Sequence, residues 1–225
     1  MDKPWGAGRD ALLAYAAGAV GATANLALIA FYALQANHPE RGDSLGVAND
    51  LIGAFGSALL IPVTLGLRRH LPRRRTVNLT QAIGVTAGAV LTLTSLLLVF
   101  GAVPFTVATP ISLIAYLLFA AWLLLVNRWL RQSQALRGPF RLGQYLGAAA
   151  IAGAAIAGLG ALPPAMSWPR LAVFATGGML FGIAILGTPI WLLLLGRALT
   201  NTADATRPAH IHETGQPAHE SGLVP

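Results

Sequence analysis

Asp50 is the residue of this sequence best suited to chemistry, because it is an acidic side chain beside an apolar segment. The run that follows it, Leu51–Leu67, contains no charged residue. A carboxylate inside an apolar membrane helix is a functional residue by default, since burying its charge there is costly. The structural alternative is a helix cap, because Asn49 and Asp50 are residue types that satisfy the first free N–H groups of a helix.

The two interpretations of Asp50 differ in where its helix begins. If the helix begins at Leu51, Asp50 is a cap at its end, and this is the interpretation we favour. If the helix begins near Leu45, Asp50 lies about 8 Å along it, at about 1.5 Å per residue. Arg41 and Arg170, on the same side, are then available to pair with the carboxylate or to meet an anionic ligand.

Other polar side chains recur at helical spacing in three apolar segments, accompanied by small residues. Asn25 follows Gly18 in the first, Ser57 follows Gly53 in the second, and Thr92 follows Gly88 in the third. Small residues let membrane helices approach closely, and polar groups hold them together. We predict a polar seam that binds a ligand through Asp50, Asn49, Asn25, Ser57, Thr92 and Gln81. Interhelical hydrogen bonding explains each of these residues equally well when it is taken singly.

Six apolar segments must position these side chains. They span about 11–34, 47–67, 80–101, 109–127, 142–162 and 171–195. Each is close to the roughly 20 residues that cross the hydrocarbon of a bilayer. Thr76–Asn127 is uncharged throughout and long enough for two segments, so we place the turn between Pro104 and Pro110. The sequence therefore predicts an all-α bundle of six transmembrane helices over 11–199, between the N-terminal residues 1–10 and a polar tail at 200–225.

Composition supports the membrane assignment. Of all residues 55% are hydrophobic and only 10% are charged, against about 25% charged in soluble domains. The basic residues gather on one side of the six segments, which predicts cytoplasmic termini. They are Lys3, Arg9, Arg68, Arg69, Arg73, Arg74, Arg75, Arg128, Arg131, Arg137, Arg141, Arg197 and Arg207. This distribution also argues against a nucleic-acid partner for the net charge of +7.

The loop 68–75 is the densest basic stretch. Arg68, Arg69, Arg73, Arg74 and Arg75 would attract anionic lipid headgroups, although topology alone explains them equally well. A single lysine beside abundant arginine, alanine and glycine suggests a high-GC bacterial genome. We therefore expect a multi-pass protein of a bacterial inner membrane.

The five tryptophans fall near the expected ends of segments, where indole rings favour the membrane interface. They are Trp5, Trp122, Trp129, Trp168 and Trp191. Pro62 and Pro189 fall inside segments and should kink their helices. The segment 142–162 consists largely of alanine and glycine, so we expect its neighbours to approach it closely.

Several kinds of chemistry lack the residues they need. The chain has no cysteine, no P-loop, no GxSxG and no HExxH motif. Its histidines, at 38, 70, 210, 212 and 219, all lie outside the apolar segments, so paired haem ligands are absent, and no buried lysine could carry retinal. We predict no cofactor and no metal site, and lean against an enzyme. His210 and His212 lie in the tail, whose last residues 221–225 resemble an added protease-site linker.

Internal similarity suggests a duplicated hairpin. The stretch from Trp122 to Leu130 echoes that from Trp191 to Leu199. The segments 80–127 and 142–195 would then be parallel repeats. The alternative is that any hairpin that leaves and re-enters the cytoplasmic side has this pattern of apolar residues, a proline at the outer turn, and tryptophan and arginine at the inner end.

Four short stretches are distinctive: Ala121–Arg128, Leu142–Gly143, Pro189–Leu199, and Asn49–Asp50 followed by Leu60–Val63. Together they resemble a group of bacterial six-helix membrane proteins known only as a domain of unknown function. The resemblance implies six helices and no particular activity.

Three functions follow from these features. The first is small-molecule or lipid binding and transport through the polar seam. The second is a non-catalytic subunit that packs against a membrane-protein partner or a second copy of the chain through its small-residue faces. The third is an intramembrane enzyme acting on an apolar prenyl or lipid substrate, which ranks last because Asp50 is the one candidate acid and has no partner carboxylate.

Overall fold

The computed structural model describes residues 5–37, 43–133, 138–161 and 168–205, and these ranges contain six long α-helices and no strand. The helices are α1 (Trp5–Asn37), α2 (Asp43–Leu67), α3 (Arg75–Val99), α4 (Phe105–Ser133), α5 (Phe140–Gly160) and α6 (Trp168–Ala205), with a short 3₁₀ turn, η2 (Arg68–His70), after α2. All six are long and apolar enough to cross a membrane. The predicted all-α bundle of six apolar helices is confirmed.

Two helix starts differ from the sequence prediction. Helix α2 begins at Asp43, well before Leu51, so Asp50 lies inside the helix and its interpretation as a cap is wrong. Helix α4 begins at Phe105 and contains Pro110, so the placement of this proline in the turn is also wrong. A proline near the start of a helix removes few hydrogen bonds, because the first N–H groups have no partner within the helix.

The turn between α3 and α4 is set by a glycine. Gly101 adopts φ 65°, a conformation that residues with a side chain rarely adopt. The Ala102 N–H donates to the Leu97 carbonyl at 2.9 Å, and the Gly101 N–H donates to the Leu98 carbonyl at 3.0 Å. This pair of bonds is a Schellman motif, which satisfies the last carbonyls of α3 and ends the helix.

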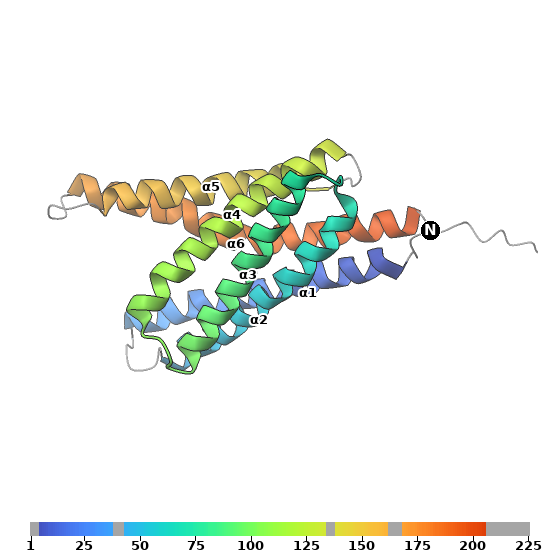
Figure 1. Cartoon of the computed structure of the whole chain (residues 1–225). Coiled ribbons are helices and arrows are strands. Elements are labelled where there is room, and N and C mark those ends of the chain that lie inside the picture. The colour runs from blue at the N-terminus through green and yellow to red at the C-terminus, as the bar shows by residue number, and fades with distance from the viewer. Residues whose placement is uncertain (1–4, 38–42, 134–137, 162–167, 206–225) are drawn as a thin grey trace, which may run out of the picture.

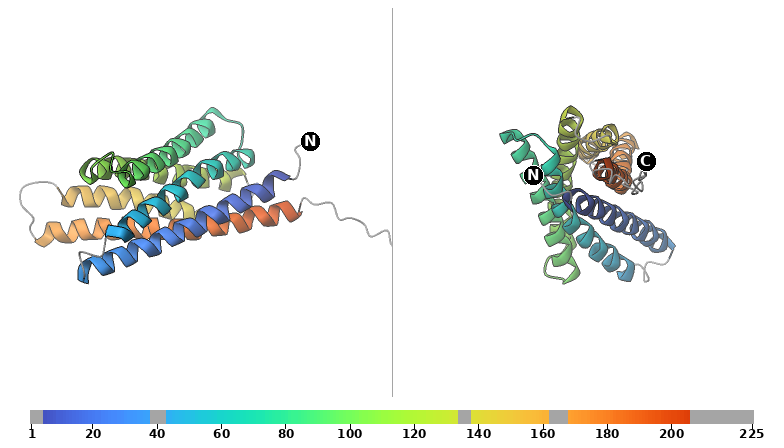
Figure 2. Two further views of the ribbon diagram at one scale, coloured as in Figure 1. Left: turned by 90° about the horizontal axis from the view of Figure 1, so that it is seen from below. Right: turned by 90° about the vertical axis from the view of Figure 1, so that its right-hand side faces the viewer.

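The helices form a closed ring in chain order. Each packs against the next one along the chain, and α1 packs against α6 to close the ring. Helix α1 begins and α6 ends at the same end of the bundle (Figures 1 and 2), which we call the terminal end. At the opposite, far end, α4 stands apart from the α5–α6 pair (Figure 1).

The core fills the terminal half of the ring. Trp122 and Trp191 are fully buried and meet edge to face, with ring centroids 6.1 Å apart. Asn127, also fully buried, accepts a hydrogen bond from Trp191 Nε1 at 3.0 Å and donates one to the Leu123 carbonyl at 2.7 Å. The expectation that all the tryptophans lie at the interface is therefore wrong for this pair, whereas Trp168 is 84% exposed.

Helix α5 approaches its neighbours as closely as its small residues predict. A Cβ added at Gly153 would lie 2.6 Å from the backbone nitrogen of Phe181, and one added at Gly147 would lie 2.7 Å from the Ala120 carbonyl oxygen. Backbones this close exclude any side chain, so α5 is held between α4 and α6. The predicted prolines inside α2 and α6 are confirmed as well.

A candidate binding cavity in the helix ring

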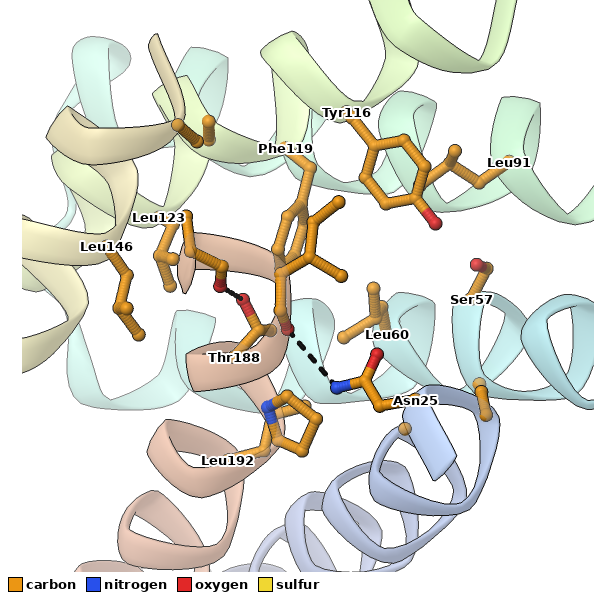
Figure 3. A pocket seen from close by; sticks show the side chains of 18 of the residues that line it. Asn25, Ser57, Leu60, Leu91, Tyr116, Phe119, Leu123, Leu146, Thr188 and Leu192 are labelled. Atoms are coloured by element: carbon orange, nitrogen blue, oxygen red, sulfur yellow. Dashed lines mark hydrogen bonds between the residues drawn. The ribbon is translucent and has the colours of Figure 1, made fainter. Parts of the chain in front are cut away.

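A cavity of about 110 Å³ lies inside the ring, and all six helices contribute residues to it. Small residues line it on the α1 and α2 side, among them Gly21, Gly53 and Gly56. Large apolar side chains face them from the other helices, among them Phe119, Leu123, Leu146 and Leu192 (Figure 3). The small residues leave a space that the large ones do not fill. Because most of these residues are apolar, the lining is mostly apolar as well.

Pro189 and Asn25 form a linked polar feature of this cavity. Proline has no N–H, so Pro189 leaves the carbonyl of Ile185, four residues earlier, without its helical donor. The Asn25 side chain supplies a donor from α1, with Nδ2 3.5 Å from the Ile185 oxygen (Figure 3). A Cβ at Gly21 would lie 3.1 Å from the Pro189 ring, so the glycine lets α1 approach α6 closely at this proline.

Two hydroxyl groups in the cavity have no partner within the described part of the chain. Ser57 and Tyr116 both line the cavity, and Figure 3 shows their hydroxyl groups on the same side of it. No hydrogen bond joins either one to another described residue. The Thr188 hydroxyl, in contrast, donates to the Ala184 carbonyl at 2.9 Å within its own helix. Ser57 and Tyr116 therefore supply lining hydroxyl groups that are available to hydrogen-bond a ligand.

Asp50 lies at the rim of this cavity rather than in its wall. It is half-buried on α2, seven residues before Ser57 and three before Gly53, both of which line the cavity. Its carboxylate accepts a hydrogen bond from the Asn49 side chain, and it interacts electrostatically with Tyr116 on α4. The predicted pairing with Arg41 concerns a residue outside the described ranges.

Thr92 and Gln81 lie outside the cavity. Thr92 donates to the Gly88 carbonyl at 2.8 Å and lies 3.5 Å from the Ala54 carbonyl, which joins α3 to α2. Gln81 is buried nearer the terminal end, and neither atom of its amide has a hydrogen-bond partner among the described residues. Of the predicted seam, the structure brings Asn25 and Ser57 to one cavity, with Asn49 and Asp50 at its rim.

A second buried acid escaped the sequence analysis. Asp10 is only 4% exposed and lies inside α1 at the terminal end. Its carboxylate is 3.3 Å from Arg69 Nη1 and 3.8 Å from His70 Nε2. A Cβ at Gly66 would lie 2.7 Å from Asp10 Oδ1, so this glycine makes room for the pair. The premise that Asp50 is the only acid within a span is wrong, but Asp10 already has a charged partner in Arg69.

The basic loop divides between internal contacts and exposed groups. Arg68 Nε donates to Asn78 Oδ1 at 2.9 Å, Arg69 pairs with Asp10, and the Arg74 guanidinium lies 5.9 Å from the centroid of Trp129. Arg73 and Arg75 are exposed at the terminal end. These two remain the side chains best placed to reach lipid headgroups.

The sequence analysis also missed the cavity residues of α4 and α6. Tyr116 and Phe181 meet edge to face with ring centroids 6.2 Å apart, and both line the cavity. In the sequence they look like ordinary apolar positions, and the one available signal was that Tyr116 is a polar-tipped residue in an uncharged run. Within the described ranges, no group of three acidic or histidine side chains is arranged to hold a metal ion.

Comparisons with models of known protein families, with curated proteins and with solved structures find no significant match to this chain. The resemblance to a six-helix bacterial family therefore remains a prediction.

Proposed function

We propose that this chain is a multi-pass protein of a bacterial inner membrane that binds a small, largely apolar molecule inside its helix ring, as the binding step of transport. The observation that supports this most directly is the cavity itself. It is mostly apolar, it carries a few convergent polar groups, and every helix contributes to it. This combination is typical of small-molecule sites.

The size of the cavity limits the occupant. At about 110 Å³ it is similar to the roughly 150 Å³ apolar cavity that binds benzene in a protein core. A ring or short branched chain fits against Phe119 and Leu123, with a polar end toward Ser57 and Tyr116 (Figure 3). Such a molecule partitions into lipid and can reach a site inside a membrane bundle.

Filling the cavity should abolish binding without disturbing the fold. Gly53 lines the cavity, and a Cβ added there meets no atom within 4 Å. We expect Gly53→Leu to place its side chain in the cavity and to weaken binding of neopentylbenzene, a neutral probe whose ring suits the cavity while its branched end lies at the rim, at least tenfold. Saturable binding is measured by equilibrium titration of the protein in lipid nanodiscs.

The matched control is Gly178→Leu. Gly178 also has open space around its Cβ position, but it lies on the exposed face of α6 and does not line the cavity. This variant should bind the probe as the wild type does. Equal saturable binding by wild type and Gly53→Leu would mean that the probe sits elsewhere, and would contradict the proposed function.

We further propose that both termini are cytoplasmic. All the described arginines except Arg170 lie toward the terminal end of the bundle, as the positive-inside rule requires of the cytoplasmic side. Green fluorescent protein fused after residue 205 should fluoresce, and alkaline phosphatase inserted within 162–167 should be active. The reverse pattern, with an inactive phosphatase and no fluorescence, would show that the termini lie on the opposite side of the membrane.

A further inference from the structure

We propose that the ligand of this cavity carries a positive charge, as an amine or quaternary ammonium group, which sits at the rim between Asp50 and Tyr116. The inference rests on the proposed function and adds the chemical class of the ligand. The apolar part of the molecule then occupies the cavity, and its cationic group faces the far end of the bundle.

The geometry of α2 directs Asp50 toward this rim. Residues seven apart on a helix project within about 20° of one another, so Asp50 shares the face of Ser57, which lines the cavity. Side chains on a helix lean toward its N-terminus. The Asp50 carboxylate therefore extends beyond Gly53, away from the buried tryptophans and toward the far end.

Besides the Asp50 carboxylate, the rim offers a cation a hydroxyl oxygen and two aromatic rings. Tyr116 lies close enough to feel the charge of Asp50, it lines the cavity, and its hydroxyl has a free oxygen lone pair for an N–H donor. The rings of Tyr116 and Phe181 stand edge to face at 6.2 Å. Aromatic faces attract ammonium groups, with a contribution of about 0.5–2 kcal/mol that grows as water is excluded.

Among the described residues, no basic side chain lines the cavity beside the Asp50 carboxylate. The ion pair between Asp10 and Arg69 lies at the other end of the bundle. A half-buried carboxylate attracts a cation more strongly than one in bulk water, because the surrounding dielectric is lower. A cationic ligand gains this attraction, whereas a neutral ligand of the same shape does not.

Two probes of matched shape test the inference. Benzyltrimethylammonium and neopentylbenzene differ in one atom, a charged nitrogen in place of a carbon. We expect wild type in lipid nanodiscs to bind the cation at least tenfold more tightly than the neutral probe. In Asp50→Asn this preference should disappear, while the neutral probe still binds. In Gly53→Leu the saturable binding of both probes should be lost.

The outcomes separate this inference from the proposed function. If wild type binds both probes equally, and Gly53→Leu binds neither, the cavity binds ligands but the cationic preference is overturned. An unchanged preference in Asp50→Asn, with the variant unfolding at the wild-type temperature, also overturns it. If wild type binds neither probe, both the inference and the proposed function fail.

Discussion

Trp191→Ala is expected to destabilise the bundle by about 4 kcal/mol, within the usual range for removing a buried tryptophan. Trp191 is fully buried, packs edge to face on Trp122 and donates a hydrogen bond to Asn127 at 3.0 Å. In a membrane the unfolded helices stay in lipid, so most of the cost comes from lost packing and from the unpaired Asn127 oxygen. The change in the free energy of unfolding is measured by unfolding both proteins in mixed detergent micelles with an increasing fraction of dodecyl sulfate.

The control variants for this prediction are Trp168→Ala and Trp191→Phe. Trp168 is 84% exposed, so its truncation should change stability by less than about 1 kcal/mol. Trp191→Phe keeps most of the packing but leaves the buried Asn127 oxygen without its donor, at a cost of about 1–3 kcal/mol. Equal effects of the two alanine variants would show that the tryptophan pair is not the core of the fold.

Gly177→Ala is expected to destabilise the bundle by about 3 kcal/mol, the upper end of the usual cost of overpacking. A methyl group there would lie 2.5 Å from the Gly153 carbonyl oxygen and would also collide with the backbone nitrogen of Ala157. Backbone atoms of α5 cannot rotate aside as a side chain can, so the two helices must separate. The same unfolding assay applies.

The neighbouring residue provides a matched control. An added Cβ at Gly178 meets no atom within 4 Å, and alanine favours a helix over glycine by about 1 kcal/mol. Gly178→Ala should therefore be neutral or slightly stabilising. If the two variants were equally stable, the close approach of α5 and α6 would be refuted.

The number of helices was predictable because each apolar run has the length of a membrane crossing, and basic blocks, a polar loop or prolines separate the runs. The helix starts were less so. Asp43 begins α2 because nothing in the sequence between it and Leu51 prevents a helix, and the apolar run alone marks only the part that lipid requires. This difference decided the position of Asp50.

The interior of the ring was harder to predict than its walls. A tryptophan near the end of an apolar run can face the interface or the core, and only the partner helix decides which. Trp122 faces the core because Gly84 leaves room for its ring: a Cβ there would lie 2.5 Å from Cδ1. The link from Pro189 through the Ile185 carbonyl to Asn25 joins residues 160 or more positions apart, beyond any local pattern.

The two halves of the ring have a consequence for any passage through it. The cavity lies on the far side of Trp122, Trp191 and Asn127, which are all fully buried and close the terminal half. A molecule in the cavity therefore meets this closed core on its way to the terminal end. To cross, it must displace an indole from its only hydrogen-bond acceptor in the described chain. In the conformation described, the Trp191 indole separates the cavity from the terminal end. A carrier cycle would require a second conformation in which that indole has moved.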